Sequence, residues 1–171
     1  GTDNGGVDKS SSPVFMIRVA FSNVPPSISL STTTVEAEQN SGFREIPAFV
    51  VLESKGGPNE PNQTVTYHVA FGEGDADLFA AGALNQPMID ATGALSFVLA
   101  ENRFGSANFT VTATDSLGTD NGGSDTSAPH NFSITIVFAN QPPQFDLPSA
   151  VATVMEGSSA IIDAFATNIQ S

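Results

Sequence analysis

The chain has 171 residues, of which 18 are acidic, 5 are basic and 40% are apolar. That apolar fraction is enough for a packed core and argues against disorder. The net charge of -13 argues against binding to nucleic acid or to anionic membrane surfaces, and it is compatible with cations as partners, calcium first. The absence of cysteine excludes disulfides and thiol chemistry, and no apolar run is long enough to insert into a membrane.

Alternation of apolar and polar residues, rich in Val, Ile, Thr and Phe, predicts strands separated by frequent Gly and Pro turns. In chain order the expected strands span 27–35, 44–53, 64–71, 88–89, 95–99, 107–115 and 130–138, with one helical turn near 77–81. In the second strand Ile46, Ala48 and Val50 would share one face, and Phe49 and Val51 the other. Residues 90–93 predict a hairpin turn with a glycine in the positive-φ position. Strands at this spacing predict an all-β sandwich.

An internal repeat organises the chain. Residues 1–8, Gly-Thr-Asp-Asn-Gly-Gly-Val-Asp, return as residues 118–125, Gly-Thr-Asp-Asn-Gly-Gly-Ser-Asp, at an offset of 117. At the same offset a strand and a linker return: Phe15, Ile17, Val19, Phe21, Asn23, Pro25, Pro26 and Leu30 become Phe132, Ile134, Ile136, Phe138, Asn140, Pro142, Pro143 and Leu147. Beyond Leu30 and Leu147 the offset between the two copies changes by a residue or so. Such self-similarity predicts tandem modules of about 117 residues.

The repeat divides the chain unevenly. Residues 23–139 are expected to form one complete module. Residues 1–22 would be the last loop and strand of a preceding module, and residues 140–171 the opening strands of a following one. Neither end piece can close a core by itself. We therefore expect the chain to be part of a longer array, with its true start upstream of Gly1.

Several short motifs follow one another in a characteristic order along the repeat. They are Asn23-Val24-Pro25-Pro26 and Asn140-Gln141-Pro142-Pro143-Gln144-Phe145, Gly57-Pro58-Asn59-Glu60, Leu78-Phe79, 90–97 (Asp-Ala-Thr-Gly-Ala-Leu-Ser-Phe), Gly105-Ser106-Ala107, Asp115 and 122–129 (Gly-Gly-Ser-Asp-Thr-Ser-Ala-Pro). In order and spacing the chain resembles the cadherin-like, Ig-like tandem repeats of giant surface proteins, such as bacterial adhesins and algal mastigoneme-type fibres. The resemblance implies Greek-key β-sandwich modules and a scaffold or adhesion role outside the cell.

The loop at 115–125 is a candidate calcium site. Asp115, Asp120 and Asp125 are spaced by Gly and Ser, and Glu36 or Glu38 could add a carboxylate if the first strand approached this loop. Calcium takes six to eight oxygen ligands on a bendable loop. The alternative is that these acids only form turns. Cadherin-type junctions usually carry an acid in the linker, whereas here no Asp stands between Asn and Pro.

Three Asn-x-Ser/Thr sequons are candidate glycosylation sites, at Asn62, Asn108 and Asn131. Such sequons also arise by chance. Strand alternation buries Phe109 and Phe132, which turns Asn108 and Asn131 outward, where a glycan could be attached.

The two Pro-Pro segments are expected to be linkers between modules. Asn23, Pro25 and Pro26, and their counterparts Asn140, Pro142 and Pro143, lie between modules. Proline fixes φ, so each linker would act as a short, semi-rigid joint. The alternative, a ligand for a proline-recognition domain, is the weaker interpretation.

No motif indicates catalysis. Neither His68 nor His130 stands in a nucleophile or metal signature, and a glycosidase-type pair at Asp75 and Asp77 has no further support. We expect a non-enzymatic structural repeat of an extracellular filament, surface fibre or adhesin, acting as a semi-rigid spacer. The alternative is an adhesive module that binds a glycan or a partner protein through its loops, with calcium as its cofactor. The expected partners are neighbouring repeats and other copies in a filament, at or outside the cell surface.

Overall fold

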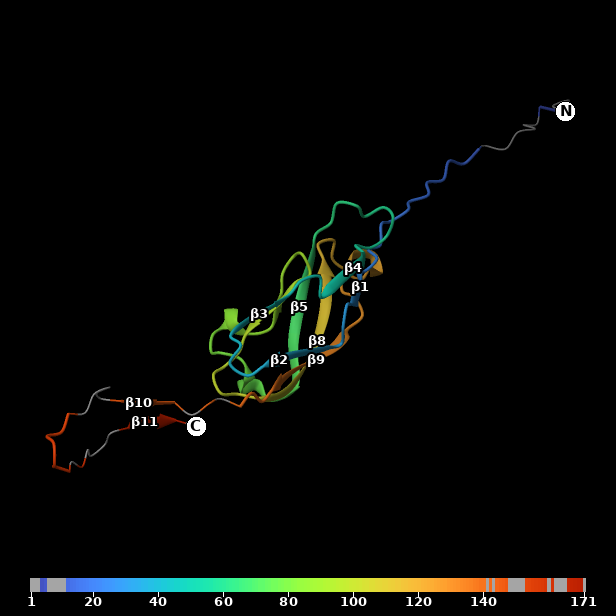
Figure 1. The fold of residues 1–171 in the computed structure, drawn as a ribbon. Helices are drawn as coiled ribbons and strands as arrows, with labels where there is room; N and C mark the ends of the chain where they lie inside the picture. Colours follow the sequence, from blue (N-terminus) through green and yellow to red (C-terminus); the bar gives the residue numbers. More distant parts are fainter. Residues whose placement is uncertain are drawn as a thin grey trace.

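The computed structural model describes residues 4–5, 12–140, 142, 144–147, 153–159, 161 and 166–170. These residues form mainly β-strands (Figure 1), so the predicted all-β class is confirmed. Helix in the described residues is limited to three 3-10 turns: Ala76–Leu78 (η1), Ala83–Asn85 (η2) and Asp120–Gly122 (η3). None of these turns is long enough to cross a bilayer.

The strands lie in two layers around one core. One layer is a four-stranded sheet of order β2-β9-β8-β5: Thr34–Glu38 (β2), His130–Val137 (β9), Gly105–Asp115 (β8) and Val65–Gly74 (β5). In this sheet β2 runs parallel to β9, and the other pairs are antiparallel. The second layer holds two antiparallel groups: Phe43–Ile46 (β3) with Leu95–Val98 (β7) and Met88–Ile89 (β6), and Ser27–Leu30 (β1) with Val50–Ser54 (β4).

Aromatic rings join the two layers. Alternation along β8 and β9 buries Phe109, Val111, Phe132 and Ile134, as predicted. Phe109 and Phe132 stack with centroids 5.4 Å apart. Phe132 also meets Phe49 edge-on at 4.9 Å, so the ring at Phe132 lies at the centre of the core. Burial of such aromatic side chains is the main stabilising term of a fold of this size.

The predicted strand at 27–35 is two strands in different layers. β1 pairs with β4, whereas β2 pairs with β9. Between them the Thr32 hydroxyl accepts a hydrogen bond from the Thr34 backbone N–H at 3.2 Å and donates to the Thr34 carbonyl at 2.9 Å. Local hydrogen bonds of this kind compete with ladder pairing. The chain therefore crosses between the layers here.

The predicted strand at 44–53 is also divided. Pro47 and Ala48 form a turn, and Ala48 has a φ of 50°. This turn breaks the expected alternation, because Phe49 and Val50 are now both buried while Val51 is exposed. β3 accordingly pairs with β7, and β4 with β1.

The hairpin predicted at 90–93 is present between β6 and β7. The Asp90 carboxylate accepts hydrogen bonds from the Thr92 hydroxyl at 2.7 Å and from the backbone N–H groups of Thr92 and Ala94. These bonds, the Thr92 hydroxyl first, hold the pKa of Asp90 below its usual value. Gly93 has a φ of 83°, and a side chain there would collide with the Val50 carbonyl.

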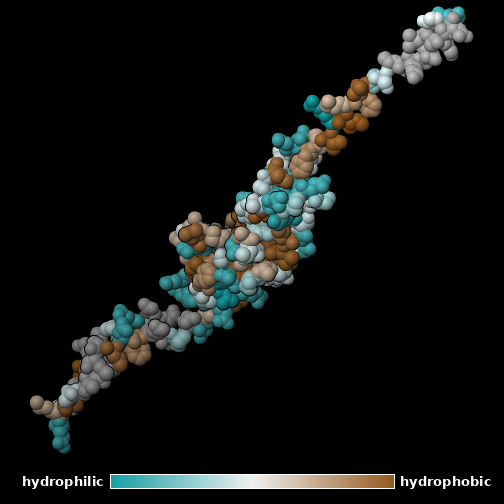
Figure 2. Space-filling model, turned by 90° about the horizontal axis from the view of Figure 1, so that it is seen from above, coloured by the Kyte–Doolittle hydropathy of each residue, from teal (hydrophilic) through white to brown (hydrophobic). Residues whose placement is uncertain are grey.

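The chain enters and leaves the sandwich at opposite ends (Figure 1). We call the end built from residues 23–24, 56–60 and 115–124 the N-terminal pole, and the end built from 39–42, 99–104 and 137–140 the C-terminal pole. Residues 12–22 extend away from the N-terminal pole without strand pairing, and most of their apolar side chains are exposed (Figure 2). Beyond the C-terminal pole Gln144–Asp146 (β10) pairs with Thr167–Gln170 (β11).

Candidate functional site: a buried polar junction

Buried polar side chains gather where the chain enters the sandwich. Asn23, Glu60, Gln63 and Asp115 are all at least nine-tenths buried, although polar residues of these types are mostly exposed in proteins. We call these four residues, with the backbone of Val24, the junction site. Its members come from the incoming chain, from the loop after β4 and from the end of β8.

The loop at 115–124 holds the incoming chain on one side. The Asn23 side-chain amide donates to Asp115 Oδ1 at 2.8 Å and to the Gly118 carbonyl at 2.9 Å. The Asn23 carbonyl accepts from the Ser124 N–H at 3.1 Å. The Asn121 side chain reaches further up the chain and donates to the Phe21 carbonyl at 2.8 Å. The loop therefore contacts both the last residues of the exposed segment and the first residue of the sandwich.

Close approach explains one glycine of this loop, Gly123. A Cβ at Gly123 would come within 2.6 Å of the Asn23 backbone nitrogen, so no side chain fits there. In the copy at 118–125 the recurring motif is thus a backbone contact as well as a turn.

Glu60 holds the other side of the incoming chain. Its Oε1 accepts from the Val24 N–H at 3.1 Å, and its Oε2 accepts from the Gly57 N–H at 2.6 Å and from Gln63 Nε2 at 3.3 Å. Gln63 Nε2 also donates to the Lys55 carbonyl. Asn23 and Val24 therefore bond to loops on both sides. The described contacts of the site are hydrogen bonds and close approaches that hold the incoming chain in place. We call this arrangement the clamp.

Three buried oxygen atoms of the junction site have no hydrogen-bond partner within the described part of the chain: Asn23 Oδ1, Gln63 Oε1 and Asp115 Oδ2. Leaving such an atom unpaired costs about 1–3 kcal/mol, and more for a charged group. Carboxylate and amide oxygens are the ligands that calcium prefers. Asn23, Gln63 and Asp115, with Glu60 beside them, are therefore the residues that could hold a cation here.

The calcium ligands expected from the sequence are not brought together. Glu36 and Glu38 are exposed on β2 near the C-terminal pole, where Glu36 pairs with Thr135 and Thr135 in turn pairs with Ser106. Asp115 lies at the far end of β8 from Ser106, about 30 Å away at the rise of a strand. Glu36 and Glu38 therefore do not approach the loop.

The other two acidic residues of the loop, Asp120 and Asp125, each accept a hydrogen bond from a residue close by in the sequence. Asp120 is exposed, and its carbonyl accepts from the Gly123 N–H. The Asp125 carboxylate accepts from the Thr126 hydroxyl at 2.9 Å. Within the described ranges no three acidic or histidine side chains gather to hold a metal ion.

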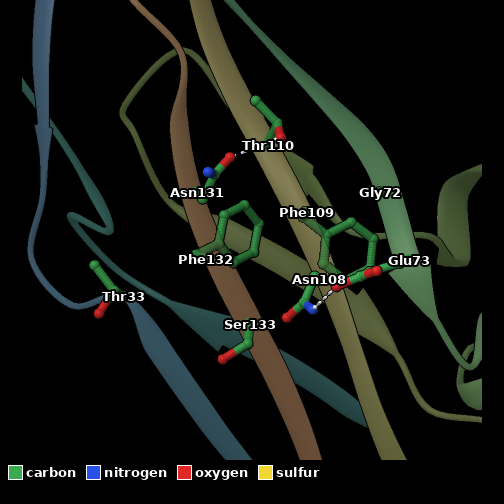
Figure 3. A pocket seen from close by; sticks show the side chains of 9 residues that line it. All are labelled: Thr33, Gly72, Glu73, Asn108, Phe109, Thr110, Asn131, Phe132 and Ser133. Atoms are coloured by element: carbon green, nitrogen blue, oxygen red, sulfur yellow. Dashed lines mark hydrogen bonds between the residues drawn. The ribbon is translucent and has the colours of Figure 1, made fainter.

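The sequons lie on exposed surface. Asn62 is in the loop after β4, and Asn108 and Asn131 are on the outer face of neighbouring strands. These last two line an open groove of about 410 Å³, where Asn108 bonds to Glu73 at 3.2 Å and Thr110 bonds to Asn131 at 2.9 Å (Figure 3). The outward orientation expected for both asparagines is confirmed; their modification stays a prediction.

The two linkers differ in the structure. Asn23 and Pro26 are buried and Pro25 is half-buried, whereas Asn140 and Pro142 are exposed. Pro143 lies outside the described residues. A similar sequence is thus buried at residues 23–26 and exposed at the described residues Asn140 and Pro142.

Sequence reasoning missed Glu60 and Gln63 as members of the site. Glu60 belongs to the motif Gly57-Pro58-Asn59-Glu60, but nothing in that motif indicates burial of its carboxylate. Comparison with known proteins found no family model, no curated protein and no solved structure that matches the chain. The function of the site therefore rests on its own geometry.

Proposed function

We propose that this chain is a non-enzymatic structural repeat of a long extracellular filament, surface fibre or adhesin, in which it acts as a semi-rigid spacer. Its modules would be Ig-like or cadherin-like Greek-key sandwiches of about 117 residues, joined head to tail. Residues 23–139 would be one whole module, flanked by parts of its neighbours. The partners are then other repeats of the same chain and other copies in the filament.

This proposal rests on a similar strand pair at two places in the chain, β1 with β4 and β10 with β11. In β1–β4, Ser27 pairs with Ser54 and Ser29 with Val51. In β10–β11, Gln144 pairs with Gln170 and Asp146 with Thr167. The first residues of β1 and β10 are 117 positions apart (144 minus 27), and the last residues of β4 and β11 are 116 positions apart (170 minus 54). Each of the two ladders contains one irregularity. The strand pair after residue 140 thus repeats the pairing of β1 with β4, as expected if a second sandwich begins there.

The placement of the two poles supports a linear array. A chain that enters at one end and leaves at the other adds length with each repeat (Figure 1). The hydrogen bonds to Asn23 and Val24 would restrict rotation where one module meets the next, because Ser124 holds the Asn23 carbonyl and Glu60 holds the Val24 N–H. Repeats that contact only their neighbours form extended structures of this kind.

Small-angle X-ray scattering tests the spacer. We would compare the chain with versions in which residues 23–139 are duplicated or triplicated in frame. The expected result is a maximum dimension that grows by a constant step with each added repeat. A compact particle whose size grows slowly with repeat number would contradict the proposal. Binding of the same proteins on a glycan array would favour the adhesive alternative.

We also propose that the junction site takes calcium, on the strength of its three unpartnered buried oxygens. Millimolar calcium is expected to raise the melting temperature of the chain, because an ion that binds only the folded state stabilises it. Asp115→Asn should abolish most of this increase, while Glu36→Gln and Glu38→Gln should retain it. Calorimetric titration without measurable heat, together with an unchanged melting temperature, would contradict calcium binding at this site.

A further inference from the structure

Two exposed aromatic rings mark the C-terminal pole. Phe104, just before β8, and Phe138, just after β9, are 55% and 64% exposed. Their rings nevertheless contact one another edge-on, with centroids 5.5 Å apart. An exposed aromatic pair beside the outgoing chain is the kind of surface that proteins use for contact with a partner.

Phe21 is the counterpart of Phe138 at the repeat offset of 117. The structure describes the surroundings of Phe21 at the N-terminal pole. Phe21 lies on the incoming chain, held by Asn121 at its carbonyl. A groove of about 360 Å³ runs between this chain and the loop at 57–60, lined among others by Val19, Phe21, Val24 and Pro58. Cavities of about 150 Å³ accept a benzene molecule, so one aromatic ring fits in this groove.

The two poles are therefore complementary. In this repeat Phe104 packs on Phe138, so in the preceding repeat the residue equivalent to Phe104 would pack on Phe21. That ring would lie at the groove beside the loop at 57–60. No other part of the described chain fills the groove.

Resting on the proposed spacer function, we infer that successive repeats meet through this aromatic contact. The Phe104–Phe138 pair of one repeat is the docking surface for the N-terminal pole of the next, and the ring of Phe104 occupies the groove next to the 57–60 loop. The contact joins both modules through side chains, in addition to the covalent linker.

Spin-label distances in a duplicated chain test this contact. The protein is residues 1–139 followed by residues 23–171, so that two copies of 23–139 adjoin at the native spacing. Because the chain has no cysteine, Thr66→Cys in both copies gives two labels at an exposed strand position. Pulsed electron paramagnetic resonance is expected to give one narrow distance distribution. Phe104→Ala in the first copy should at least double the width of that distribution.

Phe104→Ala in the second copy is the matched control, because it carries the same folding cost at a pole that faces no second label. Its distance distribution is expected to stay as narrow as that of the unsubstituted protein. Equal widths for the two variants would overturn the aromatic contact and leave the spacer proposal standing. A broad distribution in the unsubstituted protein would overturn both.

Discussion

Replacing Phe132 with alanine is expected to lower the free energy of unfolding by about 3–5 kcal/mol. Phe132 is 3% exposed and contacts Phe109 and Phe49 from the two layers of the core. Its removal leaves a cavity that the surrounding strands can fill only in part, which is why the cost exceeds that of transferring the ring to water. Urea denaturation followed by circular dichroism would measure it, since the chain has no tryptophan.

Phe15→Ala is the matched control for Phe132→Ala. Phe15 is the counterpart of Phe132 at the repeat offset, in a similar run of alternating apolar residues, yet it is 81% exposed. Its substitution is expected to change the free energy of unfolding by less than about 0.5 kcal/mol. Equal destabilisation by the two substitutions would mean that residues 12–22 pack in a core, against the structure.

Asn23→Ala is expected to lower the free energy of unfolding by about 3 kcal/mol in the presence of a calcium chelator. The substitution removes the donor for Asp115 Oδ1 and for the Gly118 carbonyl. The Asp115 carboxylate would then be left buried with one oxygen bonded only to the Leu117 N–H. Thermal and urea unfolding both report this loss.

Asn140→Ala provides the control for the clamp. Asn140 has the same linker sequence context as Asn23 but is exposed. We expect its substitution to leave the stability of the sandwich unchanged. If Asn23→Ala were equally silent, the hydrogen bonds around Asn23 would not be holding the junction.

The strongest strands could be predicted from the sequence because their alternation is long. β8 and β9 bury every second residue over most of their length, and Phe109, Val111, Phe132 and Ile134 were all assigned correctly to the core. The hairpin turn at 90–93 carried an equally clear signal in its Asp and Gly.

The two strands that divide could not be recognised in the same way. Thr32 is a normal strand residue, and only its local bonds to Thr34 show that the chain changes layer there. The apolar alternation gives no sign of the break at Ala48, where φ is positive; the breaking signal is the preceding Pro47, which cannot donate to a strand ladder. Pattern alone does not distinguish one long strand from two that pair with different partners.

The site was predicted only in part. Asp115 was expected to bind calcium, and it does lie among unpaired oxygens. Asn23 was expected to lie in an inter-repeat linker; its side chain is buried and bonds to Asp115 and Gly118, while the linker role stays a prediction. Glu36 and Glu38 were expected to add a carboxylate if the first strand approached the loop, but the parallel pairing of β2 with β9 places them toward the opposite pole. The burial of Glu60 depends on a fold-level contact with Val24.

The parallel pairing of β2 with β9 determines how the sandwich responds to pulling. Tension along a fibre would enter near residue 23 and leave near residue 140, so it would draw these two neighbouring strands in opposite directions along their common axis. Pairs from Thr34 with Ser133 to Glu38 with Val137 would then be sheared at the same time instead of opening one after another. A fold connected in this way resists extension most strongly along the line that joins its two ends.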